Sequence, residues 1–223
     1  MVGPVAAPAR LNLPAIAATL GRVQRDFDAV NRSLAARRDP LSDHVVSNMV
    51  AGYALVDALL ADGVDLLAMG NLKRLLELNT VVLCGTSPDR QALYAAHVEA
   101  TSRRFYEERD AGIEDVVEWY ARHADEPVWA RAAGVYIRIL SKPQLFIEGN
   151  HRTGALVMSY LLVREGQPPF VLSRDNAVAY FEPSASIRDS TKTGPAAFFR
   201  QAIIRRRLTA LLVRHCDRRH LTA

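Results

Sequence analysis

The chain has only two cysteines, Cys84 and Cys216, and neither belongs to a CxxC pair. Two isolated thiols argue against a disulfide framework and against a zinc site built on paired cysteines. No run of apolar residues approaches the roughly 18 that cross a bilayer. The opening residues, MVGPVAAPAR, lack the basic start and unbroken apolar stretch of a secretory signal. We therefore expect a cytoplasmic protein with no membrane partner.

The sequence also has little excess of positive over negative charge. The 28 Lys and Arg residues against 24 Asp and Glu residues leave a net charge of +4, with a pI of about 9.3. A cluster of arginines near the C-terminus could contact nucleic acid; it comprises Arg205, Arg206, Arg207, Arg214, Arg218 and Arg219. Because the overall excess is small, a solvated helix face explains the cluster better, and we do not expect nucleic acid as a partner.

Apolar residues recur at helical spacing along most of the chain, and hydrophobic residues make up 49% of it. The pattern predicts helices over 13–38, 42–63, 89–109, 112–125, 127–142, 152–166 and 197–220, and the segment 66–85 begins as a helix. It predicts loop over 167–197. The expected fold class is all-α, a single domain with its core at 40–200, a helical extension at 1–39 and a basic helix at 201–223.

One short stretch departs from the helical pattern. The β-branched residues Thr80, Val81 and Val82 suit a strand, and a turn follows them at 85–90. The sequence therefore predicts a small β-hairpin near residues 78–88.

A polar cluster separates two apolar runs in QLFIEGNHRTGALVMSYLL, residues 144–162. Gly149 and Asn150 tolerate left-handed backbone, so a loop built from them can turn several N–H groups toward one anion. A helix starting near Arg152 would add its N-terminal dipole and a guanidinium. Glu148 is a carboxylate of the kind that holds Mg²⁺ beside a phosphate. Ordinary turn chemistry, with Arg152 paired to Glu148, accounts for the same residues.

The stretch resembles the signature of Fic proteins, His-x-Phe-x-Asp/Glu-Gly-Asn-Gly-Arg-x-x-Arg. The matching residues are Phe146, Glu148, Gly149, Asn150 and Arg152. Fic proteins transfer AMP from ATP to a protein hydroxyl. The resemblance implies a Fic-like helical domain with Glu148 on Mg²⁺ and with phosphates held by the loop and first helical turn: Gly149, Asn150, His151, Arg152, Thr153 and Gly154. It also implies a target protein docked at a flap near 78–88.

Three positions depart from the family pattern. Gln144 replaces the histidine that acts as general base, and a neutral amide cannot accept a proton near pH 7. His151 replaces the second loop glycine; it is a candidate phosphate contact or displaced base, or else a solvent-facing histidine. In the related Doc branch a lysine stands there, and the terminal phosphate is transferred. Ala155 replaces the second arginine.

The loss at Ala155 has a counterpart at Ala51. Many Fic proteins carry an inhibitory helix whose glutamate pairs with the second arginine. The frame Ser47 to Gly52 resembles that helix, with Ala51 in the place of the glutamate. We expect either a divergent nucleotidyl- or phosphotransferase using Mg²⁺ and ATP, or another nucleoside triphosphate, or a catalytically inactive Fic-like protein that binds nucleotide or a partner.

Overall fold

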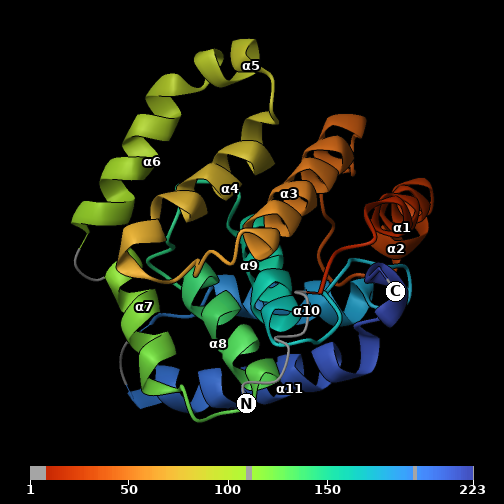
Figure 1. The fold of residues 1–223 in the computed structure, drawn as a ribbon. Coiled ribbons are helices and arrows are strands. Elements are labelled where there is room, and N and C mark those ends of the chain that lie inside the picture. The colour runs from red at the N-terminus through yellow and green to blue at the C-terminus, as the bar shows by residue number, and fades with distance from the viewer. Residues whose placement is uncertain (1–8, 109–111, 193–194, 223) are drawn as a thin grey trace, which may run out of the picture.

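The structure is a computed structural model, and it describes residues 9–108, 112–192 and 195–222 (Figure 1). The first helices are α1 (Leu13–Arg25), α2 (Phe27–Arg32), α3 (Asp43–Ala61), α4 (Lys73–Cys84), α5 (Pro88–Leu93) and α6 (Ala95–Glu107). The others are α7 (Ile113–Arg122), α8 (Val128–Leu140), α9 (Asn150–Arg164), α10 (Ala177–Arg188) and α11 (Pro195–His215). Short 3₁₀ turns lie at Met69–Asn71 and Arg218–His220. No β-strand occurs among these residues, which confirms the all-α prediction.

The predicted β-hairpin near 78–88 is wrong. Thr80, Val81 and Val82 lie inside α4, and Val82 is fully buried. Burial of this helix against α3 and α9 outweighs the modest strand preference of β-branched residues. The segment therefore offers no hairpin flap for a target protein.

The predicted loop over 167–197 is also partly wrong, because it contains α10. Tyr180, Ser184 and Ile187 are buried at the spacing of one helix face. Pro183 inside the helix hid this stripe in the sequence. Two long predicted helices are each divided in two: 13–38 holds α1 and α2, and 89–109 holds α5 and α6.

The hydrophobic core surrounds α9, which packs on α8, α3 and α4, while α11 runs beneath α8 (Figure 1). The core takes side chains from every predicted segment, including Ile16 and Leu20 of the extension and Leu208 and Leu212 of the basic helix. The backbone of Asn12 also donates to the His220 carbonyl at 2.8 Å. The two ends of the described chain are therefore joined to the same core.

Helix α3 is long and apolar enough to span a membrane by length and composition, which the sequence analysis did not anticipate. A helix at the centre of a helical bundle passes the same test. Here α3 packs between α1, α4 and α9, and its buried Asp57 accepts hydrogen bonds from Arg10 Nε at 2.9 Å and the Leu11 N–H at 2.8 Å. These contacts make α3 a core helix of the fold.

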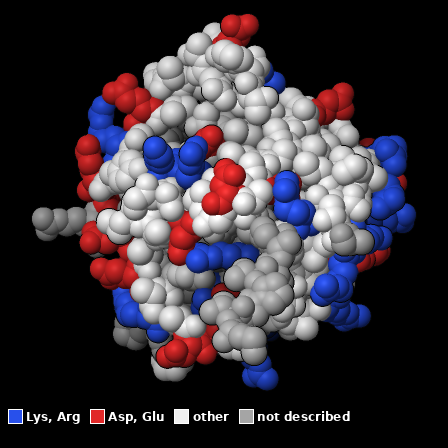
Figure 2. Space-filling view, in the orientation of Figure 1, with Lys and Arg blue, Asp and Glu red and all other residues white. Residues whose placement is uncertain are grey.

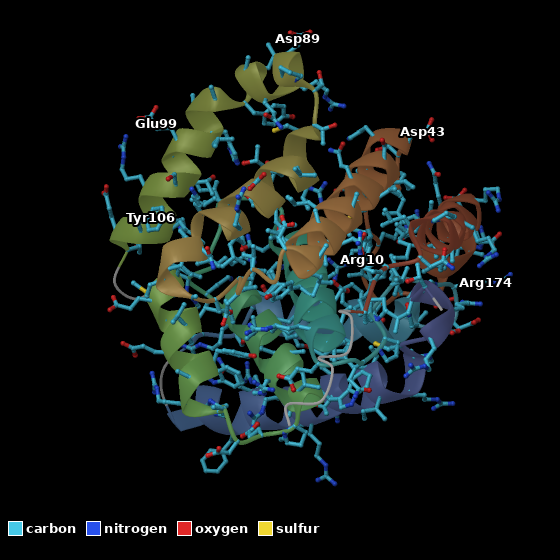
Figure 3. All side chains as sticks on the ribbon, in the orientation of Figure 1. Arg10, Asp43, Asp89, Glu99, Tyr106 and Arg174 are labelled. Carbon is cyan, nitrogen blue, oxygen red and sulfur yellow. The ribbon has the colours of Figure 1, made fainter. Side chains whose placement is uncertain are left out.

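Charged side chains of both signs are scattered over the face shown in Figure 2, with uncharged surface between them. Acidic groups are frequent over α6 and α7, and basic groups are frequent near α1. Figure 3 shows Asp89 at the tip of α5 and Glu99 pointing outward from α6. The outer side of the α5–α6 arm is thus polar, and its inner side faces the rest of the molecule.

Candidate functional site

Gly149 sets the shape of the polar loop. It is the N-cap of α9 with φ +77° and ψ 5°, a left-handed conformation that residues with a Cβ adopt at a cost. A Cβ here would also lie 2.9 Å from Asn79 Nδ2 and 3.3 Å from Leu83 Cδ2. The first N–H groups of the following helix, from Asn150 to Arg152, have no intrahelical acceptor. Gly149 has the left-handed backbone that the sequence allowed, but Asn150 does not: it is the first residue of α9, which begins two residues before the predicted start near Arg152.

The Asn150 side chain closes the loop on itself. Its Oδ1 accepts from the Phe146 N–H at 2.9 Å, and its Nδ2 donates to the Phe146 carbonyl at 2.8 Å. The side chain is buried, so it is not placed to bind a ligand directly. Its contribution is to hold the backbone N–H groups in position, which differs from the phosphate contact that the sequence suggested.

Two residues far away in the sequence anchor the loop. Asn79 of α4 donates to the Glu148 carbonyl at 2.9 Å and to Thr153 Oγ1 at 3.0 Å. Arg104 of α6 donates from Nε to the Gln144 carbonyl at 2.9 Å. The sequence analysis missed both; an asparagine in the middle of an apolar helix was the available signal for Asn79.

Gln144 occupies the position of the family's general base. Its Nε2 donates to the Leu140 carbonyl at 3.1 Å, and its Oε1 lies 3.5 Å from Asn150 Nδ2. The amide is therefore tied to the loop and the end of α8. It has neither the basicity nor the freedom to take a proton from a substrate.

Glu148 is exposed, whereas Arg152 is half-buried. Arg152 Nη1 donates to the Val82 carbonyl near the C-terminus of α4 at 3.1 Å, where the negative end of the helix dipole also favours a cation. Burial lowers the pKa of the Arg152 guanidinium, and the charge of Glu148 opposes that shift. The two residues flank Gly149 as predicted, but Arg152 is partly engaged by the protein itself.

His151 points inward and not to solvent, which corrects one of the two sequence alternatives. Its Nδ1 lies 3.1 Å from the Tyr136 hydroxyl, and its backbone carbonyl accepts from the Tyr180 hydroxyl at 3.1 Å. Burial, followed by the charges of nearby arginines, lowers the pKa of His151 to about 4. The imidazole is thus neutral at pH 7 and supplies no positive charge for a phosphate.

Thr153 and Gly154, the remaining predicted phosphate contacts, are both buried in helix packing. Thr153 accepts from Asn79, and a Cβ at Gly154 would meet the Tyr136 ring at 2.8 Å. Thr153 holds α9 against α4 through its hydroxyl, and Gly154 lets α9 lie close to α8 because it has no side chain. Any phosphate contact in this region would therefore come from the backbone N–H groups of the first turn.

The inner side of α6 carries two buried polar atoms with no hydrogen-bond partner among the described residues, His97 Nε2 and Thr101 Oγ1. They lie on the same face of α6 as Arg104: Thr101 is about one turn before Arg104, and His97 is about two turns before it. Arg104 contacts the loop at the Gln144 carbonyl. This face therefore extends along the loop, and its orphaned atoms are where a ligand or water would be favoured.

Ala155, in the position of the family's second arginine, borders an apolar cavity of about 90 Å³. Val46 and Met49 of α3 and Phe181 of α10 are among the other lining residues. No Asp or Glu is among the residues that line the cavity, so a guanidinium here would have no carboxylate partner. An apolar contact between α3 and α9 thus stands where the family would have an ion pair.

A protein-only metal site is absent from the described part of the chain, where no group of three His, Cys, Asp or Glu side chains converges. Mg²⁺ at a nucleotide site needs less, because it is commonly held by one or two carboxylates, phosphate oxygens and water. The exposed carboxylate of Glu148 next to the first turn of α9 fits that donor set.

Comparison of the chain with protein-family models, with curated proteins and with solved structures finds no match. The likeness to the Fic signature therefore depends on the loop residues themselves. Family and activity follow as proposals from these residues and their geometry.

Proposed function

We propose that the protein binds ATP, or another nucleoside triphosphate, with Mg²⁺ at the loop 144–150 and does not transfer AMP. The observation that carries this proposal is the fixed amide of Gln144 in the place of the general base. His151 does not replace the lost base, since its Nδ1 contacts Tyr136 and its unpartnered Nε2 is buried, on a side chain that borders the apolar cavity beside Ala155. The N–H groups and Glu148 would bind the nucleotide, and the base that AMP transfer would need is missing.

Phosphate oxygens would accept from the N–H groups of Asn150, His151 and Arg152, where the dipole of the 15-residue helix α9 favours negative charge. Glu148 would hold Mg²⁺, whose bound charge neutralises part of the phosphate charge. Asn79, Arg104 and the Asn150 side chain keep these groups in place before a ligand arrives. Such preorganisation lowers the entropic cost of binding.

A divergent transferase is the second candidate, and the unpaired Nε2 of His97 favours it. A base on the inner face of α6 could take the proton of an attacking protein hydroxyl while its oxygen bonds to phosphorus and pyrophosphate leaves. The geometry supports binding more directly, because the N–H groups and Glu148 lie together on one loop.

Titration calorimetry with ATP, with and without Mg²⁺, tests the proposal. We expect Glu148→Gln to remove most of the gain in affinity that Mg²⁺ gives, because the amide lacks the carboxylate charge. Glu114→Gln is the matched control, since Glu114 is an exposed residue of α7. Equal Mg²⁺ dependence in the wild type and both variants would remove Glu148 from the site.

A further inference from the structure

The last long helix, α11, turns one face toward α8 and α10 and the opposite face to solvent. Leu208 and Leu212 lie on the buried face. On the outer face Ile203 is 56% exposed and Val213 is 58% exposed. Helical geometry puts these two on one stripe with the exposed Phe199 and Ala210. The helix therefore presents an apolar line outward as well as inward.

Arginines lie within this apolar line and along one side of it. The exposed ones are Arg200, Arg206, Arg207 and Arg214. The sequence of α11 contains no Asp or Glu to balance them. Arg205 does not belong to the set, because it pairs with Glu126 at 2.8 Å and lies over the Trp119 ring. Four positive charges therefore gather on the outer face.

Arg200 and Arg207 also border a surface hollow of about 410 Å³, with Ile203 between them on the helix. Asp189 lies at its edge, but that carboxylate is already within 3.7 Å of Lys142 Nζ and 3.6 Å of Arg188 Nε. The hollow thus combines two guanidinium groups, an aliphatic side chain and an acid with partners of its own.

We propose that this outer face, Arg200, Ile203, Arg206, Arg207, Val213 and Arg214, docks on an anionic lipid surface. A phosphate headgroup would enter the hollow between Arg200 and Arg207. Ile203 and Val213 would reach the boundary between headgroups and acyl chains, as the apolar side of a helix lying on a membrane does. Such a helix needs no long apolar run, so the scarcity of such runs in the sequence does not oppose this inference.

Two other occupants fit the face less well. A second copy of the chain would bring four arginines against four arginines, and like charges across an interface disfavour association. A nucleic acid would be attracted by the arginines but gives no role to exposed Ile203 and Val213, because its contacts are largely with phosphates. A lipid surface uses both the charges and the apolar line.

The test is co-sedimentation of the full chain with vesicles of equal parts phosphatidylserine and phosphatidylcholine, against vesicles of phosphatidylcholine alone. We expect binding to the anionic vesicles only, weakening as salt is added. Each arginine near an anionic surface strengthens binding about fivefold, so Arg200→Gln with Arg207→Gln should weaken it about 25-fold. Ile203→Ser with Val213→Ser should weaken it several-fold through lost insertion.

Matched controls separate the face from net charge and general hydrophobicity. Arg103→Gln with Arg122→Gln removes the same charge from α6 and α7, and Leu93→Ser removes a side chain that is 84% exposed on α5. These variants should bind anionic vesicles like the wild type.

The proposal is overturned if the protein does not bind anionic vesicles or binds both vesicle types equally. It is also overturned if the control variants lose as much binding as the variants of the outer face. Binding to a DNA or RNA duplex that needs only the arginines, without vesicle binding, would assign the face to nucleic acid. Self-association that Ile203→Ser abolishes would assign it to a second copy.

Discussion

At the scale of single residues, most polar side chains around the loop bind other protein groups, and the backbone N–H groups are left for a ligand. The Asn150 side chain contacts the loop backbone, the Gln144 side chain contacts the end of α8, and Arg152 gives one donor to the Val82 carbonyl. The groups left for a ligand are the N–H groups after Gly149 and the exposed carboxylate of Glu148. On the proposed function, this division leaves the loop able to bind a ligand although an amide stands at position 144.

If the missing base is what limits the protein to binding, Gln144→His should create transfer. A general base typically contributes about 10²–10⁴-fold in rate, so a labelled product should rise from background to a measurable level. The measurement is incorporation of label from α-labelled ATP into protein substrates in a lysate. Gln91→His, on α5, is the control for a new histidine elsewhere. A silent Gln144→His variant that still binds ATP would show that more than the base is lost.

His151 should make the fold less stable in acid. Its pKa falls from an ordinary value of about 6.5 to about 4 in the folded state, so between these pH values the unfolded chain binds a proton that the folded chain does not. The unfolding free energy should therefore decrease as pH falls through this window, by up to about 3 kcal/mol.

Urea denaturation at a series of pH values measures this dependence. His151→Asn keeps a polar side chain near Tyr136 but cannot titrate, so its stability should vary less with pH. The pKa of His220 is also lowered to about 4 and acts in the same direction, so part of the slope stays. Identical slopes in the wild type and His151→Asn would contradict the buried, neutral imidazole.

At the scale of elements, the site depends on close packing between helices. Gly134 of α8 faces Trp119 of α7, and a Cβ on Gly134 would lie 1.7 Å from Trp119 Cη2. Gly134→Ala must therefore displace the indole, and overpacking of this kind costs about 1–3 kcal/mol. A Cβ on Gly21 of α1 would meet only Arg25 Nη1 at 3.6 Å, so Gly21→Ala should stabilise the helix by about 0.5–1 kcal/mol.

Urea midpoints of the two alanine variants measure this difference directly. Both substitutions place the same residue inside a helix, so helix propensity cancels between them. A Gly134→Ala variant as stable as Gly21→Ala would mean that α7 and α8 are not packed as described.

The elements also show where sequence reasoning reaches its limit. The periodic segments around α3, α8 and α9 and the glycine before α9 could be predicted, because spacing and backbone preference are local properties. The helical state of Thr80 to Val82 could not, since burial against α3 and α9 decides it. Asn79 and Arg104 could not be placed on the loop for the same reason, because their partners Glu148 and Gln144 are distant in sequence.

At the scale of the whole molecule, one core joins the predicted extension, centre and basic helix. The sequence predicted that α11 is basic, but only the packed structure separates Arg205, paired with Glu126, from the exposed arginines. The packed structure likewise shows that His151 points inward, whereas the sequence also allowed it to face solvent. Side-chain direction depends on which neighbours surround a helix, and the sequence of that helix does not contain this information.

We propose that the loop binds nucleotide without transferring AMP, and α-labelled ATP with Mg²⁺ tests both parts in one measurement. The protein is incubated with the label, filtered under native conditions, and then denatured. We predict that label stays with the native protein, is reduced by Gly149→Ala, whose loop would be strained, and is released completely on denaturation. No label on the native protein would contradict binding, and label that remains on protein after denaturation would contradict the loss of transfer.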